Sequence, residues 1–236
     1  MTNPQGEHIV TSYNDELINL AQQIAEMGGQ VEVAIENGTR ALLRLDRELA
    51  DVTVIADKRI DDMQRHIDEM AVSMIARRQP MASDLRAIVT AIHVASDLER
   101  VGDMAKQLAR RSLKIEGLNL QPQFYNGVKN MTNRVQSQLK DALDAYANRN
   151  AAAAIEVCNR DDEVDAMYTS LFRELLTYMM EDPRNITACT HMLFCAKSLE
   201  RIGDHATNIA ERAYYLETGK QLSEDVQELH RTQLKA

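Results

Sequence analysis

The chain has 236 residues, a formal net charge of −9 and a sequence pI near 5.2. That length suffices for one large domain or for two of about a hundred residues each. The acidic balance argues against the broad basic surface that sequence-independent nucleic-acid binding requires, so we expect no direct contact with nucleic acid. With 4% aromatic residues, nine Gly and four Pro, and with good helix formers abundant, the composition favours an all-α protein.

The sequence carries no signal for membrane insertion or export. No stretch approaches the roughly 18 apolar residues of a membrane span, and the polar start MTNPQGEHIVTSYNDE lacks the regions of a signal peptide. We therefore expect a cytoplasmic protein. The three cysteines lack the spacing of a disulfide framework, and we expect reduced thiols in the core. His191 and Cys195 could present two zinc ligands, but no second close pair completes a tetrahedral set.

Three helices are predicted in the first half of the chain. Apolar or small residues recur at steps of three and four over residues 17–45, which indicates one long helix. Asp46 can cap a second helix, which the sequence RRQP at 77–80 ends. A third helix, capped by Ser83 or Asp84, follows.

A break separates this half from a second set of three helices. The sequence EGLNLQPQFYNG, residues 116–127, contains two glycines and a proline and is predicted to connect the halves. A fourth helix starts at residue 128, and Asn150 begins a fifth that runs to about Met180. Pro183 opens a sixth helix, because proline suits a first helical turn.

The two sets of helices follow one plan. Asp57 aligns with Asp161 at an offset of 104 (161 − 57), and Glu99 aligns with Glu200 at an offset of 101 (200 − 99). The second copy is therefore three residues shorter (104 − 101). We predict a tandem repeat of two three-helix bundles with six long helices. Its parts are a first bundle over 13–116, a linker over 117–127, a second bundle over 128–216 and a polar tail over 217–236.

Acidic residues recur at four-residue spacing in both copies. In the third and sixth helices, the apolar stripe runs onto an E-x-x-x-D motif, which stacks two carboxylates on one side of a helix. The preceding helix of each copy carries a D-x-x-x-D pair, and antiparallel packing can bring the two pairs together. The candidate metal ligands are Asp57, Asp61, Glu99 and Asp103 in the first copy and Asp161, Asp165, Glu200 and Asp204 in the second.

Four carboxylates in one small volume cannot all stay ionised without compensation. Hard or borderline cations such as Mg²⁺, Mn²⁺ or iron supply it, and carboxylate sites between helices hold such ions. Gly102 and Gly203 each cost roughly 1 kcal/mol against Ala in a helix, which suggests that an ion or a neighbouring helix approaches the backbone. The alternative is that the acids are solvated or pair with Arg59, Arg100 or Arg201.

A separate group of basic residues surrounds the predicted turn between the second and third helices. Arg77, Arg78 and Arg86 could receive phosphate or the acidic patch of a partner. Arginines at such a place also cap helices and form salt bridges, and we favour that structural role.

Several longer motifs occur along the chain. They are LERVGD and LERIGD, DKRID and DDEVD, IARRQPMASDLR at 75–86, and TYMMEDPRNI at 177–186. Together they resemble the PhoU family of accessory proteins of bacterial phosphate-specific transport, from about Tyr13 to Leu216. The resemblance implies two three-helix bundles, a multinuclear metal centre of Fe, Zn, Mn or Mg on the eight acidic residues, and a regulator rather than an enzyme.

The resemblance also implies a role and partners. It implies a negative regulator of phosphate uptake and of the phosphate-starvation (Pho) response, and a homodimeric adaptor between the phosphate ABC transporter and its sensor kinase. The partners are the transporter's ATPase subunit (PstB) and the histidine kinase (PhoR), with only peripheral contact to membrane complexes. A metal-free helical scaffold is the alternative. A ferritin-like di-metal oxidoreductase is less favoured, because none of the six histidines has a Glu three residues before it.

Overall fold

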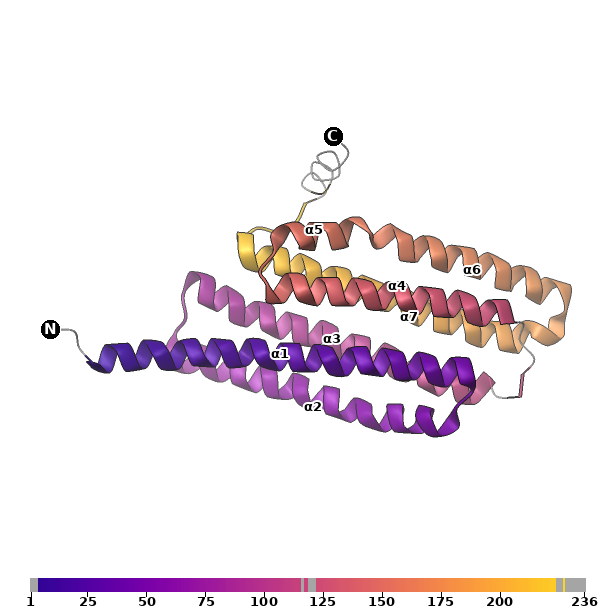
Figure 1. Ribbon diagram of the computed structural model, residues 1–236, viewed down its shortest axis with the longest axis horizontal. Coiled ribbons are helices and arrows are strands. Elements are labelled where there is room, and N and C mark those ends of the chain that lie inside the picture. The colour runs from indigo at the N-terminus through magenta and orange to yellow at the C-terminus, as the bar shows by residue number, and fades with distance from the viewer. Residues whose placement is uncertain (1–3, 116, 119–121, 224–226, 228–236) are drawn as a thin grey trace.

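The computed structural model describes residues 4–115, 117–118, 122–223 and 227, with side chains from Tyr13 onward. All regular structure in these ranges is helical (Figure 1), which confirms the prediction of an all-α protein. The elements are α1 (Pro4–Arg44), α2 (Arg47–Arg78), α3 (Ala82–Ile115), α4 (Pro122–Ala147), α5 (Ala151–Asn159), α6 (Asp161–Glu181), the 3₁₀ turn η1 (Pro183–Asn185) and α7 (Ile186–Thr218). None of the described helices is long and apolar enough to span a membrane.

Two three-helix bundles lie side by side along their lengths, as predicted. The first consists of α1, α2 and α3, and the second of α4, α7 and the consecutive pair α5 and α6 (Figure 1). The bundles join where α3 packs on α7 and α1 packs on α4. One apolar core of buried side chains continues through both bundles, so the two repeats form one folded unit.

Helix starts follow local capping chemistry in most places. Asp46 and Asn150 each accept a hydrogen bond of 3.0 Å from a backbone N–H three residues on, at the starts of α2 and α5. The prediction of a cap at Ser83 or Asp84 is wrong by two or three residues, because α3 begins at Ala82 and its cap position is Met81. The backbone of Ala82 (φ 48°) turns directly from the loop into α3, so both residues lie inside the helix.

The predicted fifth helix is divided in the structure. α5 ends at Asn159 and α6 begins at Asp161, because Arg160 between them has φ −100° and ψ 4°. The guanidinium of Arg160 donates a hydrogen bond of 2.8 Å to Asp141 of α4, which anchors the break. As a consequence, Asp161 lies at the N-terminus of a helix, whereas its counterpart in the first bundle lies within the continuous α2.

Two helices begin earlier in the sequence than predicted. α4 begins at Pro122, ahead of residue 128, so the second half of the predicted linker 117–127 is helical. Proline is compatible with a first helical turn because its φ is already helical and its missing N–H has no partner there. α1 likewise begins at Pro4, ahead of residue 13.

The C-terminal boundary lies close to the predicted one. α7 ends at Thr218, and Gly219 (φ 72°) adopts the left-handed conformation that commonly terminates helices. Of the predicted polar tail, 224–226 and 228–236 lie outside the described residues.

Polar contacts link α3 and α7 across the bundle boundary. Nδ1 of His205 lies 2.9 Å from Oδ1 of Asp97, and Nδ2 of Asn208 donates to the same oxygen at 3.4 Å. Nearer the other end, a guanidinium nitrogen of Arg111 lies 3.1 Å from Nδ1 of His191. These contacts hold in register the two helices that carry the E-x-x-x-D motifs.

α1 approaches α3 closely at a glycine. A Cβ on Gly38 would lie 2.5 Å from the carbonyl oxygen of Ala105, nearer than any side-chain carbon can stand. Gly29, on the same helix, has open space at the corresponding position, because a Cβ there meets nothing within 4 Å.

We expect Gly38→Ala to lower the free energy of unfolding by about 1–3 kcal/mol, because the added methyl group forces α1 away from the backbone of α3. Gly29→Ala is the matched control, and its better helix propensity should raise the free energy of unfolding by up to ~1 kcal/mol. Urea unfolding followed by circular dichroism measures both effects. Equal stability of the two variants would contradict the close approach at Gly38.

Candidate functional site

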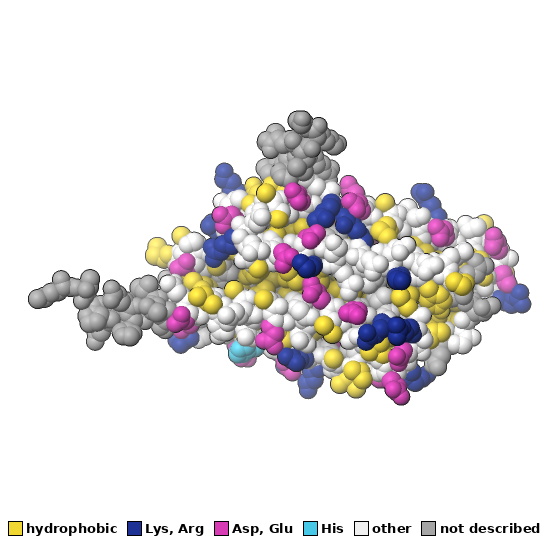
Figure 2. Space-filling model, viewed as in Figure 1, with side chains coloured by type: hydrophobic (Ala, Val, Ile, Leu, Met, Phe, Trp, Pro, Cys, Tyr) yellow, Lys and Arg dark blue, Asp and Glu magenta, His cyan; other side chains and the backbone are white. Residues whose placement is uncertain are grey.

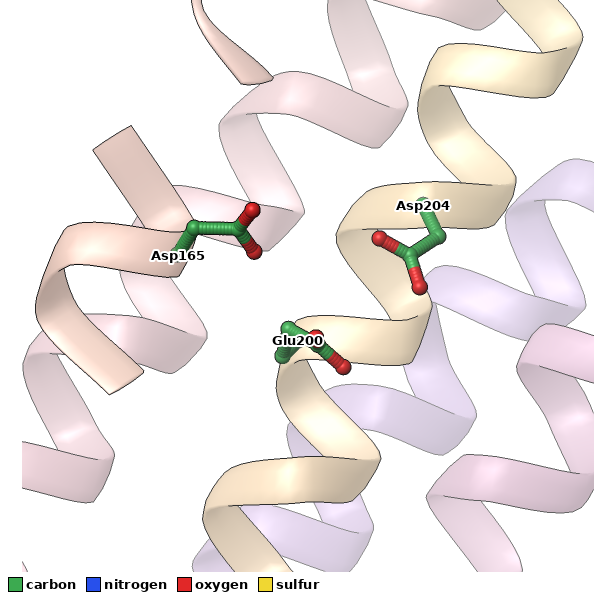
Figure 3. A group of neighbouring side chains, drawn as sticks. All are labelled: Asp165, Glu200 and Asp204. Carbon is green, nitrogen blue, oxygen red and sulfur yellow. The ribbon is translucent and has the colours of Figure 1, made fainter. Parts of the chain in front are cut away.

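Three carboxylates of the second bundle converge on one point. Asp165 extends from α6 toward α7, and Glu200 and Asp204 lie one turn apart on α7 (Figure 3). An oxygen of each lies within 4.8 Å of the others. The four-residue spacing stacks Glu200 and Asp204 on one side of α7, and the packing of α6 on α7 places Asp165 opposite these two residues. The structure therefore brings together three of the four acids predicted for this bundle.

Asp161, the fourth predicted acid, lies beside this group and is held by neutral donors. Its Oδ1 accepts a hydrogen bond of 2.7 Å from Oγ1 of Thr207 and lies 3.5 Å from Nε2 of Gln138. Nε2 of Gln138 also donates to Oγ1 of Thr207 at 2.9 Å. As the first residue of α6, Asp161 also benefits from the partial positive charge of the helix N-terminus.

Two buried oxygens at this site have no hydrogen-bond donor among the described residues: Oε2 of Glu200 and Oε1 of Gln138. Oε1 of Gln138 stands beside the glycine of the motif, 3.6 Å from where a Cβ of Gly203 would lie. The other oxygen of Glu200 accepts a hydrogen bond of 2.5 Å from Lys197. Buried acceptors without a donor cost free energy, and a cation bound beside Oε2 of Glu200 would satisfy that oxygen.

Burial and mutual repulsion raise the pKa values of two acids at this site. Burial, followed by the negative charges of Glu200 and Asp161, raises the pKa of Asp165, against the opposing effect of Lys197. Burial and the charges of the same two acids and of Asp165 raise the pKa of Asp204. A raised carboxyl pKa means that the folded chain disfavours the ionised form, so the site holds negative charge that the chain only partly compensates.

The first bundle neutralises its matching acids with cations of its own. The ammonium of Lys106 bonds to Oδ2 of the buried Asp57 and lies 3.3 Å from Oδ1 of Asp103. Arg100 approaches Glu99 at 3.5 Å and Asp103 at 3.8 Å. Burial, together with the negative charges of Asp61 and Asp103, outweighs the attraction of Lys106, so the pKa of Asp57 remains raised.

Asp61, the fourth predicted acid of the first bundle, lies close enough for its charge to act on the others. After burial, which is the largest cause, the negative charge of Asp61 contributes to the raised pKa of both Asp57 and Glu99. All four predicted acids of the first bundle therefore lie near enough to influence one another, as the repeat predicts.

One position of the repeat accounts for much of the difference between the two sites. Lys106 aligns with Thr207 by the offset of 101 that relates the two E-x-x-x-D motifs (207 − 106). Lys106 brings an ammonium to Asp57, whereas Thr207 brings a hydroxyl to Asp161. The second site thus lacks a cation at the position where the first site has one.

The residues that set this difference, Lys106 and Gln138, are not among the candidates predicted from the sequence. Lys106 follows Asp103 by three residues, a spacing that brings the two side chains together on a helix, so it could have been found. Gln138 carries no such signal, because it reaches the site from α4. Of the arginines considered as partners of the acids, Arg100 pairs with them, while Arg59 pairs with a glutamate of α1.

The repeated glycines allow the preceding helix to pack closely. A Cβ on Gly102 would lie 3.1 Å from Cδ1 of Ile60, and a Cβ on Gly203 would lie 3.4 Å from Cγ1 of Val164. Ile60 and Val164 are matching positions of the repeat (164 − 60 = 104). Close helix packing therefore explains Gly102, whereas the second site leaves more room around Gly203.

The basic residues near the α2–α3 turn have structural partners. Arg78 donates to both carboxylate oxygens of Glu16 at 2.9 and 3.2 Å, and Arg77 lies 3.7 Å from the same residue. Arg86 donates to the backbone oxygen of Leu216 at 3.1 Å. These contacts agree with the structural role that the sequence favours for the three arginines.

The zinc interpretation of His191 and Cys195 has little support. Burial raises the pKa of the Cys195 thiol to about 12, so the thiolate that zinc needs is strongly disfavoured. Nδ1 of His191 faces the guanidinium of Arg111 at 3.1 Å, and that positive charge opposes a nearby metal ion.

A cavity of about 350 Å³ lies elsewhere, at the junction of the bundles between α1 and α4. Figure 2 shows hydrophobic side chains along this junction and mixed charges over the rest of that face. Glu32 and Lys140 stand among the apolar side chains that line the cavity, and burial raises the pKa of Glu32. None of the eight predicted acids lines it, so the acidic sites are separate from this cavity.

The fold and the paired acidic motifs define a class: a two-bundle, all-α protein with a carboxylate site in each repeat. The chain belongs to the PhoU family, because the PhoU domain matches it twice, over residues 24–112 and 128–213. The resemblance found in the sequence is thereby confirmed. The family consists of regulatory accessory proteins and is not an enzyme family.

Two curated relatives match nearly their whole length. A phosphate-specific transport system accessory protein PhoU homolog from Rhizobium meliloti is 51% identical, over 91% of this chain and 90% of its own. The homolog of the same name from Caulobacter vibrioides is 47% identical, over 92% of this chain and 94% of its own.

Two solved structures share the fold. That of PhoU from Pseudomonas aeruginosa has a TM-score of 0.85 and 42% identity, and the match covers 88% of this chain and all (100%) of that chain. That of the phosphate transport system regulatory protein PhoU from Streptococcus pneumoniae has a TM-score of 0.83 and 30% identity, with 89% and 99% covered.

We expect Asp204→Asn to raise the free energy of unfolding of metal-free protein at neutral pH. The folded state raises the pKa of Asp204, so it binds more protons than the unfolded state between the ordinary and the raised pKa. The contribution of Asp204 to stability therefore falls as pH rises through this window and stays unfavourable above it. Urea unfolding in the presence of a chelator, at acid and at neutral pH, measures the effect.

Asp103→Asn is the matched control in the first bundle. Because Asp103 accepts from Lys106, its replacement removes a favourable ion pair and should not stabilise the protein. If both variants change the free energy of unfolding equally and in the same direction, the two sites do not differ in how far the chain offsets their negative charge.

Proposed function

We propose that the chain is an accessory regulator of phosphate transport that keeps the phosphate-starvation response off when phosphate is plentiful. The observation that carries this proposal is the near full-length similarity to curated relatives that are named as phosphate-specific transport system accessory proteins. The Streptococcus pneumoniae relative is described as a regulatory protein, which supports the same role.

In this role the chain is a cytoplasmic adaptor. It contacts the ATPase subunit of the phosphate transporter (PstB) and the sensor histidine kinase (PhoR), and it reaches membrane complexes only through these partners. It acts as a homodimer. Such an adaptor transmits the state of the transporter by binding, so it needs no catalytic group of its own.

Metal binding at the second bundle supports this adaptor. Asp165, Glu200 and Asp204 offer carboxylate oxygens, and Gln138 offers a buried amide oxygen. An all-oxygen set suits Mg²⁺, Mn²⁺ or iron, whereas structural zinc sites favour Cys and His. The buried, unpaired Oε2 of Glu200 is the observation that best supports a cation here.

The first bundle fits a metal ion less well. Lys106 already bonds to Asp57 and Asp103, so an ion would have to displace an ammonium group. We therefore propose that the second site binds a metal ion more tightly than the first. The acids of the first site remain paired with Lys106 unless metal is abundant.

A di-metal oxidoreductase is not favoured by the surroundings of the site. Ferritin-like sites use a Glu-x-x-His motif on each of two helices, and the sequence has none. His205 follows Asp204 directly, yet its Nδ1 bonds to Asp97 of α3. The histidine nearest in sequence to the acids is thus engaged at the bundle boundary.

We expect purified protein to bind Mn²⁺ or Fe²⁺ and to gain about 2.7 kcal/mol of stability when free metal exceeds the Kd by ~100-fold. Glu200→Gln should weaken binding at least roughly tenfold, since a charged ligand is lost. The matched first-bundle variant, Glu99→Gln, should change the affinity of the tighter site little. Titration calorimetry and elemental analysis of protein purified without chelators measure both.

The opposite outcome has a clear meaning. If the protein is metal-free as purified and its stability does not change when Fe, Mn, Zn or Mg is added, the metal proposal is wrong. The chain is then a helical scaffold without a metal centre.

We expect deletion of the gene to raise alkaline phosphatase activity in cells grown in high phosphate, because the starvation response loses its negative regulator. Tagged protein from the same cells should retain PstB and PhoR under mild purification. Unchanged phosphatase activity, or retention of neither partner, would contradict the proposed role.

A further inference from the structure

The second bundle exposes a set of large apolar side chains on α6 and α7. We call it the α6–α7 strip and define it by Tyr168, Phe172, Leu176, Met180, Ile186 and Phe194. Apart from the half-buried Tyr168, their exposed fractions range from 38% for Phe172 to 77% for Met180. Other apolar residues of the same helices already fill the core, so the strip is surface in excess of what the fold buries.

The members of the strip lie on adjoining helix faces. The four on α6 follow one another at four-residue spacing, which places them on one side of that helix. The ring centroids of Tyr168 and Phe172 are 6.3 Å apart, and Nζ of Lys197 on α7 lies 5.4 Å from the Tyr168 ring. The short η1 turn then leads from the end of α6 to Ile186 at the start of α7.

The internal repeat provides a comparison within the same molecule. Phe172 aligns with Asp68 (172 − 68 = 104), and Phe194 aligns with His93 (194 − 93 = 101). Tyr168 aligns in the same way with Gln64 (168 − 64 = 104). The aromatic positions of the strip are therefore polar in the first bundle.

The aliphatic positions of the strip differ less between the bundles. Leu176 and Ile186 have the apolar counterparts Val72 (176 − 72 = 104) and Leu85 (186 − 85 = 101). The helix packing common to both bundles thus accounts for aliphatic residues at the surface, but it does not call for aromatic ones. Aromatic residues, Met and Arg are the side chains enriched where proteins bind one another.

One edge of the strip is cationic. The guanidinium of Arg111 on α3 lies 4.1 Å from the centroid of the Phe194 ring, close enough for a cation–π contact. Lys114 lies one turn along α3 from Arg111. Burial and the positive charges of Arg111 and Lys114 all lower the pKa of His191 on α7, so Lys114 also lies near this edge. A partner seated on the strip therefore meets two positive charges along its α3 side.

The remaining surroundings do not suit an anionic lipid surface. The exposed charged residues of α6 beyond Tyr168 are Arg173, Glu174 and Glu181, so this part of the surface carries no net positive charge. The end of the strip at Tyr168 adjoins the carboxylates of the acidic site through Lys197, which pairs with Glu200. A bilayer with negative headgroups would be repelled there, whereas a peptide segment can present charge on one flank only.

We propose that the α6–α7 strip docks one amphipathic helix of a protein partner, with its apolar face on the strip and acidic side chains along the flank beside Arg111 and Lys114. Helix docking of this kind uses apolar anchors at steps of three and four residues, which match the spacing of the strip. This inference rests on the proposed function, in which the chain acts by binding other proteins.

The first test compares matched variants in binding to the purified ATPase subunit and to the cytoplasmic part of the histidine kinase. Leu176→Gln and Phe194→Gln should each weaken binding to one of these partners roughly tenfold, because the residues are apolar anchors. Val72→Gln, at the matching exposed position of the first bundle, should leave affinity unchanged. Arg111→Glu should also weaken binding, and its effect should shrink as salt increases.

The second test identifies the occupant directly. Benzoylphenylalanine in place of Leu176, and in place of Val72 as the control, is photo-crosslinked in cells, and the attached peptide is sequenced. Crosslinks from position 176 to an amphipathic helix with acidic flanking residues support the proposal. Crosslinks to lipid or to a second copy of this chain, or equal crosslinking from both positions, overturn it.

The two tests separate this inference from the proposed function. If the unmodified chain binds a partner and Leu176→Gln binds equally well, the strip is not the docking surface, while the regulatory role stands. If the unmodified chain binds neither partner, the proposed adaptor role fails, and the crosslinked peptide alone decides whether the strip docks a helix.

Discussion

Repulsion among carboxylates is the constraint around which both halves of the molecule are arranged. Apolar stripes draw α3 and α7 into the shared core, and the E-x-x-x-D motifs continue those stripes. Asp165 and Asp204 still reach solvent, whereas Asp57 is buried and cannot reach water unless the helices give up apolar contacts. Residues around each group must therefore offset its charge, and the raised pKa values of Asp57 and Asp204 indicate that they do so only in part.

The two repeats meet this constraint differently. In the first bundle an ammonium group from Lys106 lies between Asp57 and Asp103, and the tight packing of Ile60 against Gly102 closes the site. In the second, hydroxyl and amide donors hold Asp161, and an oxygen of Glu200 stays buried without a donor. One repeated plan thus yields a site with an ammonium group from the chain between its acids and a site without such a group at the matching position. The direct packing of α3 on α7 holds both sites in one core.

The second bundle also carries the features that suit partner binding. Lys197 connects them, because it pairs with Glu200 of the acidic site and lies over the ring of Tyr168 in the α6–α7 strip. The acidic site and the strip therefore share one side chain. The first bundle has serine at the position of Lys197 (197 − 101 = 96) and polar residues in place of the strip's aromatic side chains. Its Asp57 and Asp103 already pair with Lys106. Its helix α3 packs directly on α7 of the second bundle.

The sequence by itself determined the all-α class, the duplication and the eight acids, because helical periodicity and four-residue spacing are local properties and a repeat can be compared with itself. It could not locate the break at Arg160, where the anchor is Asp141 on another helix. Nor could it tell which acids are neutralised. That depends on Gln138, which reaches Asp161 from α4, and on Lys106, which reaches from α3 to Asp57 on α2. Only the tertiary structure decided these points, because they depend on side chains from separate helices that meet when the bundle packs.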